Sequence, residues 1–194
     1  MSVRRFRLGL YGGSFDPVHQ GHLIQAQDAL EQASLDAVVW IPCAQSPHKK
    51  SATEATAAQR LTLLEKALED HPHFWISRAE IDRKGPSYTI DTVELFRDAL
   101  PRAELFLLIG ADQLPLLDAW HRAKELRRLV TFLVFSRPGH PLRRKRRGVI
   151  SLPRPRAVDI SATEIRARVK KDLPINHLVP PAVAAHIARR RLYR

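Results

Sequence analysis

The residues with the clearest chemical potential lie near the amino terminus, between positions 12 and 23. This segment reads Gly-Gly-Ser-Phe-Asp-Pro-Val-His-Gln-Gly-His-Leu and follows a short apolar run. Gly12 and Gly13 allow a sharp turn with no Cβ to keep a ligand away from the backbone. The first N–H groups of a helix that begins after such a turn attract anions. His19 and His22 are three positions apart, so both imidazoles can face one phosphate chain from the same side of the helix start.

This pattern differs from the two common phosphate-binding motifs, because it contains neither Gly-Lys-Ser/Thr nor Gly-x-Gly-x-x-Gly. The plainer alternative is a turn followed by a helix cap, and an isolated His-x-x-His would favour that alternative. Twelve residues in this order after a first strand favour a phosphate-binding loop, with a histidine pair in the place of the usual lysine.

A second candidate segment, Ile-Ser-Ala-Thr-Glu-Ile-Arg, occupies positions 160–166. Ser161 and Glu164 fit a Ser-x-x-Glu capping box, which alone would explain both residues. The same helix start also brings a hydroxyl, free backbone N–H groups and the guanidinium of Arg166 to one place. That combination suits a polyphosphate.

The middle of the chain carries residues suited to a nucleoside. Asp112 follows an apolar strand-like run, and an Asp in that place can accept hydrogen bonds from ribose hydroxyls. Trp120 offers a flat face to a heteroaromatic ring, although a lone Trp is more often a core residue. Thr89 lies in the segment Pro-Ser-Tyr-Thr-Ile-Asp-Thr at positions 86–92, for which a helix cap is the plainer alternative.

Positions 13–22 resemble the Gly-x-Phe-Asp-Pro-x-His-x-Gly-His signature of the nucleotidyltransferase superfamily, which includes adenylyl- and cytidylyltransferases. Over essentially its whole length the chain resembles the bacterial nicotinate mononucleotide adenylyltransferases. The late segment resembles the Ile-Ser-Ser-Thr-x-Ile-Arg motif of that family, with Ala162 where a second serine is usual, which weakens the carry-over of one hydroxyl contact, while Ser161, Thr163 and Arg166 remain in register. The resemblance implies transfer of AMP from ATP to nicotinate mononucleotide, which gives deamido-NAD and pyrophosphate in NAD biosynthesis.

The resemblance also implies roles for single residues on the ATP side. His19, His22 and Arg166 would bind the ATP phosphates and act in catalysis. The other ATP contacts would come from Gly12, Gly13, Ser14, Phe15, Gly110, Ser136, Ser161 and Thr163. Mg²⁺ would be bound through the ATP phosphates and water, with no protein ligands of its own.

On the acceptor side, Asp112 would hold the ribose and Trp120 would stack on the pyridine ring. Thr89 and the backbone N–H of His121 would bind the nicotinate carboxylate. His48 and Lys49 lie in the loop after the second expected strand, where they would help to neutralise phosphate, with a solvated loop as the plainer alternative.

Short apolar runs alternate with helical patterns along the whole chain. The runs typical of buried parallel strands are residues 6–11, 37–41, 74–78, 104–109, 131–135 and, more weakly, 156–160. The helical patterns are residues 21–33, 57–69, 90–99, 122–128, 161–170 and 181–192. This order predicts an α/β fold with a doubly wound parallel, Rossmann-like sheet, whose ligands bind beyond the carboxyl ends of the strands. We expect one nucleotidyltransferase domain over residues 1–194, in which the basic segment 137–194 carries the second phosphate-binding helix.

Composition and charge limit the other possibilities. The 194 residues include one cysteine, which excludes an internal disulfide, and no apolar run approaches the ~18 residues of a membrane helix. We therefore expect a cytoplasmic protein with no membrane partner. The net charge of +12 is concentrated beyond residue 136, where 16 Lys or Arg face three Asp or Glu. The densest run is Arg-Arg-Lys-Arg-Arg at positions 143–147.

Two rival functions stay open at this point. A sister adenylyltransferase acting on nicotinamide mononucleotide or phosphopantetheine would share both ends of the chain, but the segments around Thr89, Asp112 and Trp120 favour a pyridine nucleotide. A protein that binds RNA or DNA through the basic segment would need interleaved aromatic side chains, which that segment lacks. The sequence gives no indication of an oligomeric state.

Overall fold

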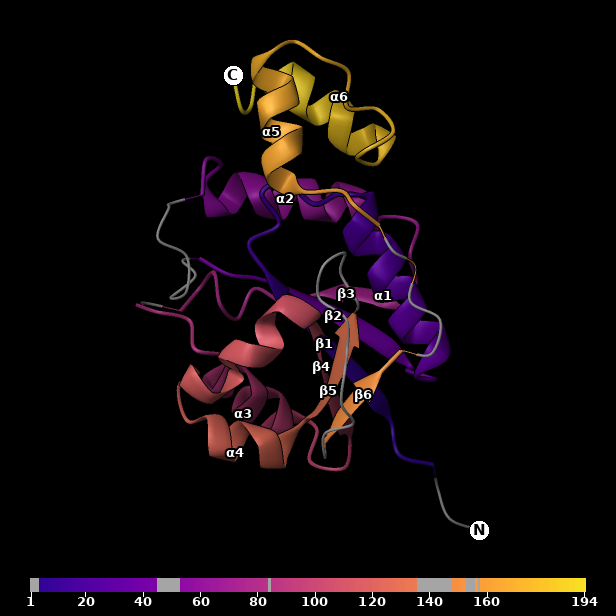
Figure 1. The fold of residues 1–194 in the computed structure, drawn as a ribbon, viewed down its shortest axis with the longest axis vertical. Helices are drawn as coiled ribbons and strands as arrows, with labels where there is room; N and C mark the ends of the chain where they lie inside the picture. Colours follow the sequence, from indigo (N-terminus) through magenta and orange to yellow (C-terminus); the bar gives the residue numbers. More distant parts are fainter. Residues whose placement is uncertain (1–3, 45–52, 84, 136–147, 153–155, 157) are drawn as a thin grey trace.

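The computed structural model describes residues 4–44, 53–83, 85–135, 148–152, 156 and 158–194 (Figure 1). Its centre is a parallel sheet in the order β3-β2-β1-β4-β5-β6. The strands are β1 (Arg7–Gly13), β2 (Ala37–Pro42), β3 (Phe74–Ile76), β4 (Glu104–Gly110), β5 (Thr131–Phe135) and β6 (Val149–Ser151). The helices are α1 (Gln20–Gln32), α2 (Ala57–Leu68), α3 (Thr89–Ala99), the 3₁₀ helix η1 (Ala111–Ala119), α4 (Ala123–Leu129), α5 (Ala162–Lys170) and α6 (Pro181–Arg190).

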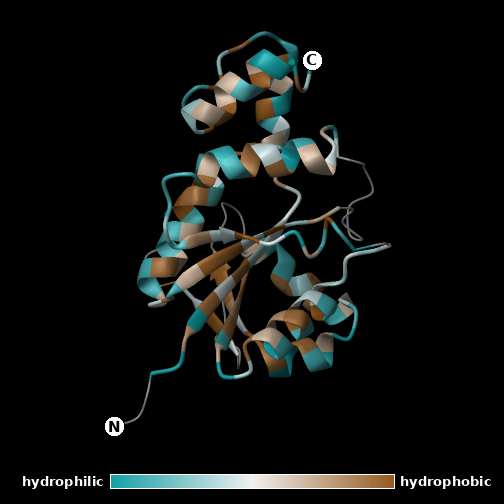
Figure 2. Ribbon diagram, turned by 180° about the vertical axis from the view of Figure 1, so that it is seen from behind, coloured by the Kyte–Doolittle hydropathy of each residue, from teal (hydrophilic) through white to brown (hydrophobic). Residues whose placement is uncertain are grey.

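The central strands are apolar on nearly every residue because helices cover both faces of the sheet (Figure 2). Successive side chains of a strand point to opposite faces, so the core divides into two clusters. Phe106 and Leu108 belong to the cluster that includes residues of α1, α2, α5 and α6, whereas Leu105 and Leu107 belong to the one that includes residues of α3, η1 and α4. The predicted doubly wound α/β fold is thereby confirmed.

The strand order reverses between β1 and β4, which pair directly with Leu10 opposite Leu107. In sheets of this kind ligands bind in the crevice beyond the carboxyl ends of the strands at that reversal. Here β1 ends at Gly13 and β4 ends at Gly110. The two loops that follow are the ones in which the sequence predicts the ATP site and the acceptor site.

Helices α5 and α6 stack beyond α2, at the carboxyl end of the sheet (Figure 1). The N–H of Gln20, the first residue of α1, donates to the carbonyl of Leu178 at 2.9 Å. Ile165, Val183 and Ile187 bury their side chains in the same cluster as α1 and α2. Helices α5 and α6 therefore share a core with α1 and α2, and the segment between them is hydrogen-bonded to the start of α1.

The prediction of a sixth strand at 156–160 is wrong, because the described residues of that segment form no strand. The sheet instead ends at β6, which pairs with β5 and lies before the predicted segment. The N–H of Arg156 donates to Asp28 Oδ2 at 3.2 Å, so this segment lies along α1. The helix η1 also has no counterpart among the predicted elements.

Within the described part of the chain, no helix combines the length and apolar character needed to cross a membrane.

Candidate active site

The loop between β1 and α1 folds back on itself around Phe15. This residue is buried and has a positive φ of 45°. A Cβ built on Gly13 would lie 3.0 Å from the Phe15 ring, so the absence of a side chain there leaves room for this close approach. The same ring packs edge-on against His22, with centroids 5.1 Å apart. Phe15 thus forms an apolar support beneath the second histidine.

His19 and His22 lie together at the start of α1. His19 is the N-cap residue, and the two rings stack with centroids 3.6 Å apart. The backbone N–H of His19 donates to Nδ1 of His22 at 3.2 Å, so a neutral His22 ring carries its proton on Nε2. A Cβ on Gly21 would lie 3.1 Å from the His19 ring. Both imidazoles are therefore fixed beside the N–H groups of a helix N-terminus.

Asp16 ties the loop to distant parts of the chain. Its carboxylate accepts hydrogen bonds from the N–H of Glu54 (2.8 Å), the N–H of Ala55 (3.1 Å) and the hydroxyl of Tyr193 (2.9 Å). Burial, followed by the charge of Asp16, raises the pKa of Tyr193, which keeps the hydroxyl protonated as a donor. The carboxylate therefore fixes the conformation of the loop without facing solvent.

Arg166 brings the late segment to the same loop. Its Nη1 donates to the carbonyl oxygen of Asp16 at 2.7 Å, and its Nε donates to Glu54 Oε1 at 3.0 Å. Nη2 lies 3.4 Å from Thr163 Oγ1. Ser161 caps α5, because its hydroxyl accepts from the N–H of Glu164 at 3.1 Å. Segments 12–22 and 160–166 therefore meet, as a shared phosphate site requires.

The acceptor-side residues gather at the end of β4. Asp112 lies two residues beyond Gly110 and accepts a hydrogen bond from Gln113 Nε2 at 2.8 Å. Trp120 is half-buried and packs against the core cluster that contains α3 and α4. The ring of His121 packs against that of Tyr88 in a tilted arrangement, with centroids 4.4 Å apart. This contact joins the His121 segment to the start of α3, where Thr89 is the first helical residue.

Two side chains near the start of α3 donate hydrogen bonds to Glu80. Thr92 donates its hydroxyl to Glu80 Oε1 at 2.8 Å, and Ser87 donates to the Glu80 carbonyl at 3.4 Å. Burial raises the pKa of Glu80. The position of Thr89 is thus set by its neighbours on both sides.

The sequence model of the cytidylyltransferase-like family matches residues 10–168. The chain belongs to this family. It is 47% identical to a probable nicotinate-nucleotide adenylyltransferase of Methylacidiphilum infernorum, over 97% of this chain and 92% of that protein. It is 42% identical to a protein of the same name from Thermus thermophilus, over 97% of this chain and the whole of that protein. The resemblance to the nicotinate mononucleotide adenylyltransferases is therefore confirmed.

Solved structures give the same fold for this member of the cytidylyltransferase-like family. The Plasmodium falciparum nicotinic acid mononucleotide adenylyltransferase in complex with NaAD superposes with a TM-score of 0.78 at 18% identity, covering 97% of this chain and 98% of that one. A putative nicotinate-nucleotide adenylyltransferase from Vibrio parahaemolyticus superposes with a TM-score of 0.72 at 18% identity, covering 94% and 99%.

Three predicted site residues, Ser136, His48 and Lys49, lie outside the described residues, as does the run 143–147.

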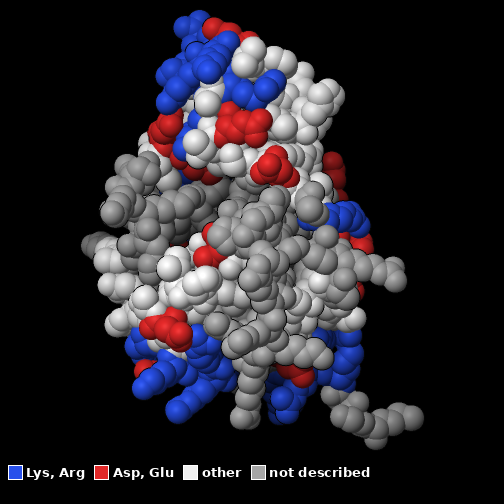
Figure 3. Space-filling view, in the orientation of Figure 1, with Lys and Arg blue, Asp and Glu red and all other residues white. Residues whose placement is uncertain are grey.

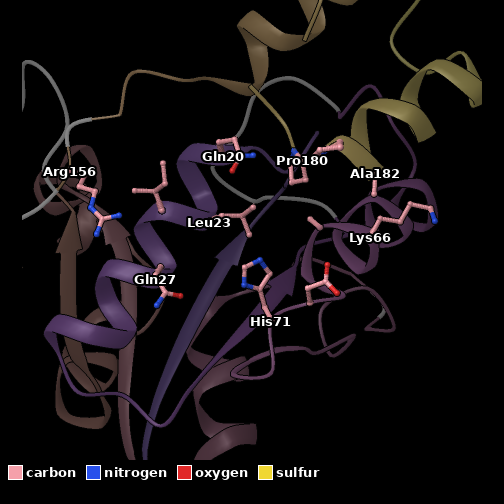
Figure 4. Close-up of a pocket in the computed structure, with 12 residues that line it drawn as sticks. Gln20, Leu23, Gln27, Lys66, His71, Arg156, Pro180 and Ala182 are labelled. Carbon is pink, nitrogen blue, oxygen red and sulfur yellow. The ribbon is translucent and has the colours of Figure 1, made fainter. Parts of the chain in front are cut away.

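The remaining predicted residues do not line either of two cavities in the described structure. One of about 600 Å³ lies between α1, α2 and the start of α6 and includes Leu23, Lys66 and Pro180 (Figure 4). The other, of about 810 Å³, includes Arg97 and Arg128. The candidate site lies instead at the carboxyl edge of the sheet, where β1 and β4 end.

Charged side chains gather at the two ends of the molecule. Lys and Arg lie over α5 and α6, with Asp and Glu among them, and again beyond α4 at the opposite end (Figure 3). Among the described residues, no group of three or more His, Cys, Asp or Glu side chains could hold a metal ion.

Sequence reasoning missed Arg60, which holds three parts of the site together. It is fully buried, although it lies in an ordinary amphipathic helix pattern. Its guanidinium donates to the carbonyl oxygens of Ser14 (2.5 Å), Cys43 (2.7 Å), Ala44 (3.2 Å) and Ala55 (3.3 Å). The ends of β1 and β2 and the start of α2 therefore share one cation.

Replacing Arg60 by Met should destabilise the fold by about 3 kcal/mol, because several buried carbonyl oxygens lose their donors at once. Chemical denaturation measures this change in the free energy of unfolding. The matched control is Arg78→Met, an exposed arginine that pairs with Asp82 four residues along the chain and should have little effect. Equal stability of the two variants would contradict the role given to Arg60.

Proposed function

We propose that the chain transfers AMP from ATP to nicotinate mononucleotide, forming deamido-NAD and pyrophosphate. The observation that carries this proposal is the meeting of the histidine pair and Arg166 at the end of β1, next to Asp112 at the end of β4. The phosphate site thus lies on one side of the strand reversal, and the nucleoside site lies on the other. The names of the full-length relatives and the NaAD-bound Plasmodium structure support the choice of acceptor.

ATP would lie along the start of α1. The helix N-terminus, His19 and His22 would bind its phosphates, and Arg166, Ser161 and Thr163 would close over them from α5. The backbone of residues 12–15, with Gly110 and Ser136, would surround the rest of the nucleotide. Mg²⁺ would enter bound to the ATP phosphates, where it neutralises charge. The described donors fit this arrangement, because around the phosphates they are imidazoles, N–H groups and a guanidinium.

The pyridine nucleotide would lie over η1. Asp112 would accept from its ribose hydroxyls and Trp120 would stack on its ring. Thr89 begins α3, and the first N–H groups of a helix have no partner within the helix. Together with the N–H of His121, which the Tyr88 contact holds nearby, this position would bind the nicotinate carboxylate.

The reaction follows from this arrangement. A phosphate oxygen of nicotinate mononucleotide attacks the α-phosphorus of ATP, the new P–O bond forms, and the bond to the bridging oxygen breaks to release pyrophosphate. The attacking phosphate is already ionised, so no general base is required. Catalysis then consists of aligning two polyanions and stabilising the charge that develops on the α-phosphoryl group.

We further propose that residues 1–194 act as one nucleotidyltransferase domain, with the second phosphate-binding helix in segment 137–194. The substrates of the proposed reaction are small metabolites in water, which fits a cytoplasmic enzyme with no membrane or nucleic-acid partner.

Labelled ATP tests the class of reaction. With nicotinate mononucleotide present, label at the α-phosphate should appear in the dinucleotide, and label at the γ-phosphate should appear in pyrophosphate. Label from the γ-phosphate in the nucleotide product would show phosphoryl transfer and overturn the proposal.

The basic run 143–147 provides a separate test against the nucleic-acid alternative. Changing three of its arginines to Glu should leave turnover largely intact, because the proposed site uses none of them. The same change should abolish any RNA affinity that filter binding detects at low salt. Loss of turnover in a folded variant would place the run in the substrate site.

A further inference from the structure

Glu54 connects α5 to the β1–α1 loop. Its Oε1 accepts from Arg166 Nε at 3.0 Å, and its Oε2 lies 2.9 Å from Lys170 Nζ, one helical turn further along α5. Its own N–H donates to the carboxylate of Asp16 at 2.8 Å. The hydrogen bond from Lys170, together with that from Arg166, lowers the pKa of Glu54, so the side chain is ionised at neutral pH.

The contacts of Arg166 leave its guanidinium little freedom. Nε is held by Glu54, Nη1 by the Asp16 carbonyl and Nη2 by Thr163, and the side chain is only 19% exposed. A guanidinium has five N–H groups in one plane, so one on Nη1 and one on Nη2 have no partner among the residues that the structure describes. The direction of those two is set by the three contacts. Of these, only Glu54 provides a charged partner within hydrogen-bond distance, since Asp16 Oδ2 lies 4.0 Å away.

We infer that Glu54 is a positioning residue for Arg166, holding its guanidinium so that the two remaining N–H groups of Nη1 and Nη2 meet the triphosphate of ATP. This inference rests on the proposed function, in which Arg166 binds those phosphates. Glu54 itself touches neither substrate. It acts by fixing the plane of the Arg166 guanidinium. The strength with which this group binds phosphate depends on the direction of its N–H groups.

A carboxylate near a phosphate site could also act in the opposite way, by repelling ATP. The charges on the structure argue against that role. Glu54 contacts two cations, Arg166 and Lys170, so the three side chains together keep a positive charge. The two roles predict opposite effects on the KM for ATP when the charge of Glu54 is removed.

The test is steady-state kinetics of Glu54→Gln with each substrate varied in turn. The KM for ATP should rise about tenfold, a loss of the size expected when a binding group is slightly misplaced, while the KM for nicotinate mononucleotide stays unchanged. The matched control is Glu69→Gln, the same change at an exposed position at the end of α2, which should leave both KM values unaltered. A KM for ATP that falls or stays unchanged in Glu54→Gln would overturn the inference.

A double-variant cycle separates positioning from general support of the fold. In an Arg166→Ala background, Glu54→Gln should add less than a roughly twofold effect, because the group that it positions is gone. Effects of the two changes that multiply would show that Glu54 acts independently of Arg166. If Glu54→Gln folds poorly, Glu54→Asp keeps the charge and should give a smaller rise in the KM for ATP; a wild-type or lowered KM in that variant would overturn the inference.

The same data separate this inference from the proposed function. Wild-type ATP kinetics in Arg166→Ala would remove Arg166 from the ATP site. An impaired Arg166→Ala variant combined with an unaffected Glu54→Gln variant would overturn only the role of Glu54.

Discussion

Replacing His22 by Ala is expected to lower kcat by roughly 10²-fold or more, the scale of removing one preorganised donor, with a smaller change in ATP binding. The reason is geometric. His22 is held by Phe15 on one side and by the stacked His19 ring on the other, and its Nδ1 accepts from the backbone. In the proposed site, a neutral ring would then present its Nε2 proton to the charge that develops on the α-phosphoryl group.

The kinetics of purified His22→Ala measure this effect directly, with kcat and the KM for ATP determined separately. His177→Ala is the matched control, because His177 is exposed between α5 and α6 and belongs to neither proposed subsite. It should turn over like the unmodified enzyme. Wild-type kcat in His22→Ala would remove the histidine from the catalytic role.

The second large effect is the choice of acceptor, measured as kcat/KM for each mononucleotide. A nicotinate carboxylate can take two N–H donors at the Thr89 and His121 positions. A neutral carboxamide brings its own NH₂ donors against them and leaves at least one group badly paired. That mismatch should cost roughly 2–4 kcal/mol, a preference of about 30- to 1000-fold for nicotinate over nicotinamide mononucleotide.

Trp120→Ala locates the source of that preference. Both substrates carry flat cationic pyridine rings of similar size, so loss of stacking should weaken both and leave their ratio nearly unchanged. A ratio that collapses only in Trp120→Ala would move the selectivity from the carboxylate to the ring.

Most of the fold could be predicted from local patterns, because the central strands are continuous apolar runs covered on both faces. The sixth strand could not. Strand β6 has three residues that are half-buried or exposed, and so it carries no strong apolar signal. The segment predicted in its place has an apolar pattern for another reason. Val158 lies near Gly21, and Ile160 packs against the cluster that contains α1.

The candidate site, too, could be predicted only in part from the sequence. His19, His22 and Arg166 belong to compact motifs, so their types and spacing are visible in the sequence. Arg60 and Glu54 act through contacts with residues that lie 46 and 112 positions away, at Ser14 and at Arg166. No local pattern marks such residues, because a buried arginine in an amphipathic helix has the same sequence context as an exposed one.

The most direct test of the whole account is a competition experiment with the unmodified protein. Limiting ATP is supplied with equal concentrations of nicotinate mononucleotide, nicotinamide mononucleotide and phosphopantetheine, and the adenylylated products are separated and identified by mass. The product ratio then reports the ratio of kcat/KM values. We expect deamido-NAD to exceed NAD by about 30-fold or more, with no adenylylated phosphopantetheine. Equal amounts of the two dinucleotides, or a product made mainly from phosphopantetheine, would contradict the assignment of the acceptor.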